Sequence, residues 1–157
     1  MDLDTARSLA NEIRDKLLPL CGPRRCEIVG SIRRGRDLCG DVDIVLIPGN
    51  QGRLALALRA LGSEIKSGPK LHACVYSGQH VDVYIATEQT WWTLMLIRTG
   101  SKEHNIMMCS RARSMGMKLH ADGSGLTRDN GTLIQPSSEQ DIFTCLKLPY
   151  KRPEERG

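Results

Sequence analysis

The chain has 157 residues, of which 40% are hydrophobic and 25% are charged, an ordinary composition for a globular protein. Its net charge of +4 is compatible with a nucleic-acid partner without specifying one, and its length allows one domain or two small subdomains that share a site. The polar N-terminus and the lack of a long apolar run lead us to expect neither a signal peptide nor a membrane span.

Six cysteines are present, but none forms a Cys-x-x-Cys pair and no set of Cys and His has zinc-site spacing. We therefore expect reduced cysteines in an intracellular protein. Cys39, beside Gly40 and Asp41, is expected to be a small packing residue rather than a reactive thiol.

Apolar residues at helical spacing predict a first helix over residues 4–18, ended by Pro19 and Gly22. The elements expected next are a strand at 26–29, a helical turn near 33–35, a strand at 41–47, a break at 48–50 and a helix at 51–61. Two further strands, at 71–76 and 80–86, are joined across Ser77-Gly78-Gln79, which is typical of a hairpin.

The second half is predicted to be mainly helical. A helix at 88–97 is interrupted by Thr99-Gly100, and Ser101 can cap the next helix, which runs to about residue 115. After a short β region, Ser138 with Asp141 predicts the start of a last helix that ends near 147, and the tail is expected to be extended. Because β-type patterning gives way to helix near 87–92, we expect one subdomain over 1–89 and another over 90–157.

The segment GSIRRGRDLCGDVDIVL, residues 30–46, carries the strongest functional signal. Alternate residues of a strand share a face, so Asp41 and Asp43 are expected to point one way, while Val42, Ile44 and Leu46 point into a core. Two carboxylates held together on a strand repel each other unless a cation lies between them. The pattern therefore favours a divalent metal site.

A third carboxylate, Asp82, lies inside the alternating segment HVDVYIA. One interpretation is that Asp41 is a turn residue and that Asp43 lies on the surface of an edge strand. That interpretation explains three aspartates among residues that favour burial poorly, because burying an unpaired charge is costly. Three aspartates suit Mg²⁺, which prefers oxygen ligands, and indicate two-metal phosphoryl transfer.

The Gly30-Ser31 turn, between a strand and a helical turn, exposes backbone N–H groups to which an anion can bind. Such turns are usually only turns, and arginine pairs on loops are usually solvated. Arg34, three residues further on, adds a cation suited to phosphate oxygens. The combination of GSxxR with a following GDxD is the more specific signal.

Other polar and aromatic residues have alternative interpretations. His80 is expected on the same strand face as Asp82, where it could contact that carboxylate or a phosphate, or else face solvent. The other histidines, His72, His104 and His120, lack metal-ligand spacing and are expected to be structural or exposed. The Trp91-Trp92 pair is expected to pack at the subdomain junction rather than to stack on bases.

Three segments together resemble the family X DNA polymerases, the polymerase beta-like group of nucleotidyltransferases. The first is GSIRRGRDLCGDVDIVL, similar to the GSxRRG…GDxD palm motif of that family. The second is VDVYIATEQTWWTLMLIRTGSKEHN, which ends in a TGSxxxN element, and the third is SSEQDIFTCLKLPYKRPEER, similar to the family's C-terminal LPY region. The resemblance implies an α+β fold, in which a nucleotidyltransferase palm with a mixed β-sheet and helices precedes a small α+β nucleotide-contacting subdomain.

The resemblance also implies roles for particular residues. Asp41, Asp43 and Asp82 would bind two Mg²⁺ ions, for which Mn²⁺ could substitute, and Asp82 would activate the primer 3′-hydroxyl. The implied nucleotide-binding residues are Gly30, Ser31, Arg34, Gly40, Gly100, Ser101 and Asn105. Family members often hold the Gly-Ser peptide of TGS in the cis form. Trp91 would lie in the hinge between the subdomains.

Two departures from the family pattern shape the expected activity. No N-terminal lyase or helix-hairpin-helix region is recognised, so we expect a minimal form without lyase activity and with salt-sensitive DNA binding. Many members carry an aromatic pair immediately before TGS, where the sugar is selected, whereas this chain has Ile97 and Arg98. Arg98 could instead contact phosphate or template.

The leading hypothesis is a monomeric, template-directed DNA polymerase that adds dNTPs to gapped or primed DNA, filling short gaps in repair. A second hypothesis is a template-independent or ribonucleotide-tolerant nucleotidyltransferase. A third is a non-catalytic DNA- or nucleotide-binding module, against which the three aspartates argue.

Overall fold

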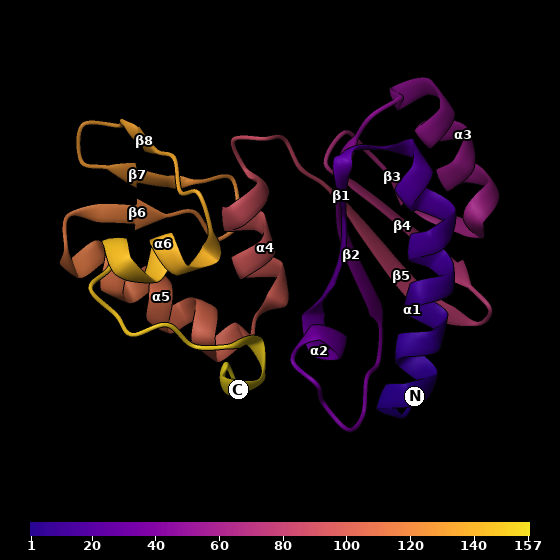
Figure 1. Cartoon of the computed structure of the whole chain (residues 1–157), viewed down its shortest axis with the longest axis horizontal. Helices are drawn as coiled ribbons and strands as arrows, with labels where there is room; N and C mark the ends of the chain where they lie inside the picture. The colour runs from indigo at the N-terminus through magenta and orange to yellow at the C-terminus, as the bar shows by residue number, and fades with distance from the viewer.

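The computed structural model describes residues 1–157, apart from the side chain of Arg24. The chain forms two halves, each built around its own β-sheet (Figure 1). The N-terminal half contains α1 Leu3–Leu17, β1 Cys21–Val29, α2 Gly30–Arg33, β2 Val42–Pro48, α3 Gln51–Leu61, β3 Ser63–Ser67, β4 Leu71–Tyr76 and β5 Gln79–Ile85. The C-terminal half contains α4 Trp91–Thr99, α5 Lys102–Ser114, β6 Met117–Leu119, β7 Leu126–Arg128, β8 Leu133–Ile134 and α6 Glu139–Cys145, and short 3₁₀ turns lie at Leu18–Leu20 and Pro153–Glu155.

The larger sheet has five strands in the order β1-β2-β5-β4-β3. Its central pair, β2 and β5, is parallel, and every other pair is antiparallel. The smaller sheet, β6-β7-β8, is antiparallel throughout. A mixed sheet with helices, followed by a small α+β unit, confirms the predicted fold class.

Strand β2 is buried on both of its faces, and this burial sets the position of the site. Ile44 and Leu46 pack in the core beneath α1 and α3. Val45 and Ile47 face the opposite way and pack in a junction core with residues of α4, the helix that lies between the two sheets in Figure 1. Asp43 shares this second face by strand alternation. The acidic end of β2 therefore points towards the boundary between the halves.

Several local predictions are confirmed with small shifts. The first helix, the helix at 51–61 and the hairpin at 71–86 are present, and the Ser101 and Ser138 hydroxyls accept the capping hydrogen bonds of α5 and α6. Cys39 is buried, as expected of a packing residue.

Other predictions were wrong in detail. Strand β1 begins at Cys21 rather than at residue 26, because Cys21 already pairs with Pro48 of β2, and an irregularity in the pairing separates it from Cys26. The helical turn starts at Gly30, not at 33, and Asp41 precedes β2 instead of lying within it. The tail is not simply extended, since it forms a 3₁₀ turn and buries Arg156. No helix of the described chain has the length and apolar character needed to cross a membrane.

Candidate active site

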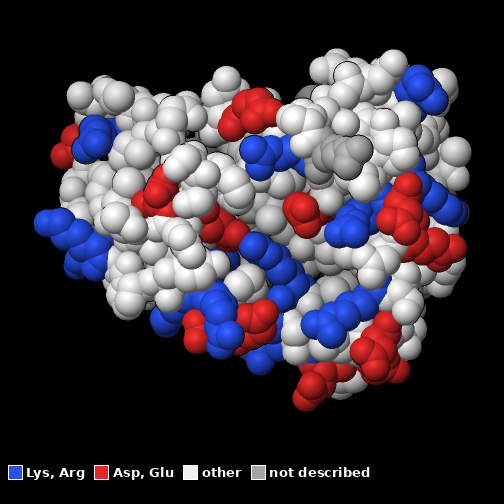
Figure 2. All heavy atoms as spheres, in the orientation of Figure 1, with Lys and Arg blue, Asp and Glu red and all other residues white. Residues whose placement is uncertain are grey.

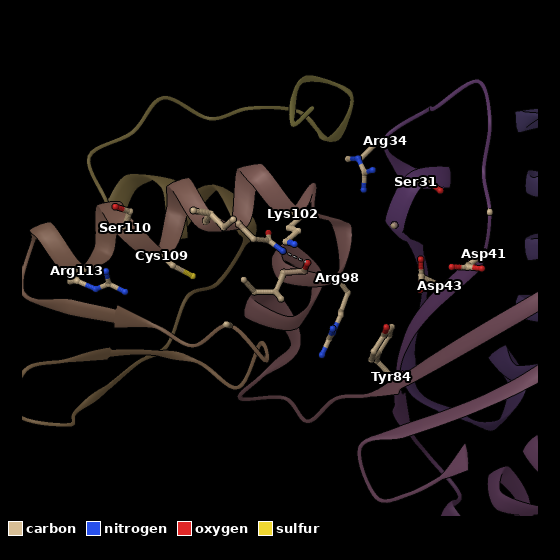
Figure 3. Close-up of a pocket in the computed structure, with 17 residues that line it drawn as sticks. Ser31, Arg34, Asp41, Asp43, Tyr84, Arg98, Lys102, Cys109, Ser110 and Arg113 are labelled. Carbon is tan, nitrogen blue, oxygen red and sulfur yellow. Dashed lines mark hydrogen bonds between the residues drawn. The ribbon is translucent and has the colours of Figure 1, made fainter. Parts of the chain in front are cut away.

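A cavity of about 720 Å³ lies where the two halves meet, and Figure 3 draws the 17 residues that line it. We call it the central cavity. The N-terminal half contributes residues of α2, of the loop that follows it and of strands β2 and β5, namely Gly30, Ser31, Arg34, Gly40, Asp41, Asp43 and Tyr84. The C-terminal half contributes one face of α5 and the end of α4, including Ile97, Arg98, Gly100, Lys102, Asn105 and Arg113. The cavity therefore has an acidic end at Asp41 and Asp43 and a wall along α5 that carries Lys102 and Arg113 (Figure 3).

Eight of the ten residues named from the sequence line this cavity, and the other two, Asp82 and Ser101, lie outside its lining. Asp82 is on β5, two residues before Tyr84. Ser101 is 7% exposed and is used structurally, because its hydroxyl accepts a hydrogen bond from the backbone N–H of His104 at 3.2 Å.

Asp43 and Asp82 are brought together by strand pairing. Asp43 of β2 is the direct partner of Asp82 on the parallel strand β5. Asp82 is held by the residues two before and two after it on the same face of its strand: His80 Nε2 lies 3.0 Å from Oδ1, and the Tyr84 hydroxyl donates to Oδ2 at 3.4 Å. His80 thus contacts the third carboxylate, which was one of the two alternatives.

Burial and mutual repulsion act on Asp43. Burial, followed by the charges of Asp82 and Asp41, raises the pKa of Asp43 to about 6, and the positive charges of Arg98 and His80 oppose that rise. The pKa of Tyr84 is raised to about 12, first by burial and then by the charges of Asp43 and Asp82. Negative charge therefore dominates this end of the cavity.

This donor set suits a hard divalent cation in its chemistry, because it offers carboxylate oxygens that repel each other until positive charge is supplied. Within the part of the chain that the structure describes, no three His, Cys, Asp or Glu residues stand close enough to form a closed metal cage. The ligand chemistry fits Mg²⁺ or Mn²⁺, but the described residues do not already enclose a metal ion.

Gly30 leaves the space that the Asp43 side chain occupies. Its φ is +67°, which favours glycine, and a Cβ at this position would collide with the Asp43 carboxylate. The following residue, Ser31, places its side chain at the cavity (Figure 3). A small turn therefore stands directly beside the acidic end.

Arg34 links the same turn to the other half of the protein. Its Nη1 donates to the Thr99 carbonyl at 2.6 Å, and burial, followed by the charge of Arg36, lowers the pKa of Arg34. Gly100, with φ +70°, lies against this guanidinium, and the Gly100-Ser101 peptide is cis. Asn105 donates its side-chain N–H to the Ile97 carbonyl at 2.8 Å, the dashed contact in Figure 3.

Tyr84 and Arg113 are among the cavity residues that were not assigned a role from the sequence. Tyr84 lies two residues after Asp82, so strand alternation alone could have placed it on the acidic face. The Arg98 guanidinium stacks over the Tyr84 ring, 4.2 Å from the ring centroid. Arg113 could have been found by its helical spacing from Lys102 and Asn105, and it lies at the far end of the cavity (Figure 3).

A buried ion cluster, Arg33-Glu139-Arg156, joins the two halves beside the cavity. Arg33 donates to Glu139 Oε1 at 3.0 Å and Oε2 at 2.5 Å, and Arg156 Nη1 donates to Oε1 at 2.7 Å. Burial alone would raise the pKa of Glu139, but the two arginines outweigh burial and hold that pKa below its usual range. No local pattern in the sequence indicated this cluster.

The tryptophans pack at the junction, as predicted. Trp91 is buried, meets Trp92 edge-on with ring centroids 6.3 Å apart, and belongs to the junction core. The Arg25 guanidinium lies 5.1 Å from the Trp91 ring and 5.3 Å from the Trp92 ring. On the face seen in Figure 2, basic side chains follow the boundary between the halves, with acidic side chains among them.

Comparisons with known proteins identify a family and several similar proteins. Residues 94–157 match the family model described as DNA polymerase beta thumb. Rat DNA polymerase lambda is 31% identical over 163 residues, which cover 83% of this chain and 28% of that protein. The DNA polymerase/3′-5′ exonuclease PolX of Bacillus subtilis is 29% identical, over 96% of this chain and 27% of that protein. The chain thus spans less than a third of the length of these relatives.

Two solved structures of Leishmania infantum polymerase beta share the fold. The ternary P/T complex has a TM-score of 0.85 at 23% identity and covers all of this chain and 76% of that one. The ternary gap complex has a TM-score of 0.83 at 22% identity and covers 99% of this chain and 70% of that one. Taken together with the matched thumb region and the two relatives, these similarities show that the chain belongs to family X, the polymerase beta-like nucleotidyltransferases.

Proposed function

We propose that this chain carries the catalytic centre of a template-directed DNA polymerase, which adds deoxynucleotides to a primer 3′-hydroxyl in short gaps of DNA. The observation that supports this proposal most is the pairing of Asp43 with Asp82 on adjacent parallel strands, beside a glycine-serine turn and the guanidinium of Arg34. This arrangement offers carboxylates to cations and donors to phosphate across one cavity.

The chain's own residues divide the work by position. Asp41, Asp43 and Asp82 would hold two Mg²⁺ ions, and when bound these would lower the pKa of the attacking hydroxyl and neutralise the leaving pyrophosphate. Ser31 and Arg34 would bind and orient the triphosphate. Hydrogen bonds from Tyr84 and His80 would fix the orientation of the Asp82 carboxylate next to the primer end.

The C-terminal half would supply the surface for the new base pair. Asn105 lines the cavity one turn into α5, and Lys102 and Arg113 place positive charge on the same helix. Positive charge along this wall suits nucleic-acid phosphates, whose binding is sensitive to salt. Gapped or primed DNA and a dNTP are therefore the proposed partners, and the protein is proposed to act as a monomer.

The test is primer extension by the purified 157-residue chain with Mg²⁺, on gapped, recessed and single-stranded substrates. We expect extension on gapped DNA that is lost in Asp43→Asn and kept in Asp37→Asn. Asp37 is an exposed residue of the same loop region and does not line the cavity, so this variant controls for the loss of one carboxylate. An absence of extension on every substrate, or equal activity in the two variants, would contradict the proposal.

A second candidate function is addition of ribonucleotides or synthesis without a template. It is supported by Ile97 and Arg98, which line the cavity where the resemblance implies an aromatic pair at the sugar. The same assay with ribonucleotides and with single-stranded primer separates the two functions. Extension of single strands would favour the second candidate, and a strict requirement for template would exclude template-independent synthesis.

A further inference from the structure

Arg98 is a cation at the acidic end of the central cavity that has no carboxylate partner. It lines the same cavity as Asp41 and Asp43. Among the described residues, none of the ion pairs within 4.0 Å includes Arg98.

The position of Arg98 is set by packing rather than by an ion pair. The guanidinium stacks over the Tyr84 ring, and Figure 3 shows the two side chains beside each other. Its Nε is buried and has no hydrogen-bond partner. Tyr84 in turn donates its hydroxyl to Asp82, so the guanidinium is held against a residue that touches the aspartate cluster, Asp41, Asp43 and Asp82. Arg98 is on α4 and the aspartates are in the N-terminal half, so the guanidinium acts on them across the boundary between the halves.

An unpaired guanidinium near three carboxylates has opposite effects on two states of the site. Without metal ions, it offsets part of the repulsion within the aspartate cluster. When divalent cations enter, the same charge repels them, and the repulsion is only partly screened in a half-buried cavity. An anion that enters with the cations removes this penalty by pairing with the guanidinium.

We propose that Arg98 is the resident counter-ion of the aspartate cluster and makes binding of divalent cations depend on the triphosphate. This inference rests on the proposed function, since it takes the aspartates as metal ligands and a nucleoside triphosphate as the anion. A cation alone binds weakly, because the positive charge of Arg98 repels it. Cation together with triphosphate binds tightly, because the guanidinium then has phosphate oxygens to face. By thermodynamic linkage, the triphosphate must bind more tightly in the presence of the cation by the same factor.

The experiment measures Mn²⁺ binding to the full chain by electron paramagnetic resonance, with and without a non-hydrolysable dNTP analogue. In Arg98→Met, which removes the charge and keeps much of the side-chain length, we expect Mn²⁺ alone to bind about threefold more tightly or better. The tightening that the analogue causes in the unaltered chain is expected to shrink by a similar factor. Arg98→Lys keeps the charge and is expected to resemble the unaltered chain.

Arg113→Met is the matched control, because it removes the same charge from the same cavity at the end away from Asp43 (Figure 3). It is expected to leave the affinity for Mn²⁺ alone unchanged. The inference would be overturned if Arg98→Met bound Mn²⁺ alone no more tightly than the unaltered chain does. It would also be overturned if Arg113→Met raised the affinity for Mn²⁺ alone as much as Arg98→Met does. If the unaltered chain binds no Mn²⁺ even with the analogue, the proposed function fails as well, so the two failures are distinguishable.

Discussion

Asp43 and Asp82 lie directly opposite each other on adjacent parallel strands, β2 and β5. Neighbouring strands are about 4.8 Å apart, so the two side chains leave the sheet side by side on its boundary face. Val45 and Ile47, further along the same face of β2, are buried in the junction core and fix the strand in place. The sheet therefore holds two like charges together in a frame that cannot relax by moving one of them away.

The first prediction concerns the pKa of Asp43 in the metal-free protein. Asp82→Asn is expected to lower it from about 6, because the Asp82 charge is the largest contribution after burial. Asp41→Asn is expected to lower it by less, since Asp41 contributes less than Asp82. Titration of the labelled carboxyl carbon by NMR measures both shifts, and Asp37→Asn is the control. An unchanged Asp43 pKa in Asp82→Asn would mean that the two carboxylates do not interact.

The second prediction concerns Gly30, whose missing side chain leaves room for Asp43. Gly30→Ala is expected to lower the free energy of unfolding by more than the roughly 1–2 kcal/mol of a left-handed backbone, because the new Cβ also meets the carboxylate. Gly78→Ala is the matched control, since Gly78 also has a positive φ, +77°, but nothing lies near its Cβ. Urea unfolding of the two variants separates backbone strain from crowding. Equal losses would show that Gly30 is needed only for its backbone conformation.

Strand β2 and helix α3 could be predicted from the sequence almost to the residue, because both depend on local patterns. Alternating apolar residues mark the strand, and Pro48-Gly49-Asn50 separates it from the helix. Strand β3 was missed because all five of its residues are exposed, so its sequence shows no alternation of apolar and polar residues. Its pairing with β4, not its own pattern, makes it a strand.

In the candidate site, too, residues in local sequence patterns could be predicted and residues joined only by the tertiary fold could not. The aspartates and Gly30 were found because they occur close together or in alternating strands. The pairing of Glu139 with Arg33 joins residues 106 positions apart, and Arg156 completes the cluster from the last turn of the chain. In the sequence, Glu139 looks like an ordinary acidic residue in the first turn of a helix. Only the tertiary fold shows that it is buried.

The third prediction tests this buried cluster. Glu139→Gln is expected to lower the free energy of unfolding by an amount on the order of 3 kcal/mol, because it leaves the buried Arg156 without a compensating charge. Glu27→Gln is the control, since Glu27 pairs with Arg14 at 4.0 Å on the surface and is expected to cost less than about 1 kcal/mol. Guanidinium unfolding measures both. A loss in Glu139→Gln as small as that of Glu27→Gln would show that the cluster does not hold the halves together.

The fourth prediction concerns pH and depends on His104. Both ring nitrogens of this histidine are buried without hydrogen-bond partners, and its ring lies 5.8 Å from that of Phe143. Burial, followed by the charges of Arg156 and Lys151, lowers the pKa of His104 to about 4, and Glu139 opposes this only in part. Between about pH 6.5 and about pH 4, the unfolded chain therefore binds more protons at this position than the folded chain.

The contribution of His104 to stability is consequently complete above about pH 6.5 and is lost as the pH falls towards 4. His104→Leu is expected to reduce the difference between the free energies of unfolding at pH 7 and pH 5, measured by urea unfolding. Asp43, whose pKa is raised, acts in the opposite direction over part of this range, but it does so equally in both proteins and cancels in the comparison. His120→Gln controls for the loss of one histidine. If His104→Leu keeps the full difference between the two pH values, another group must be responsible for it.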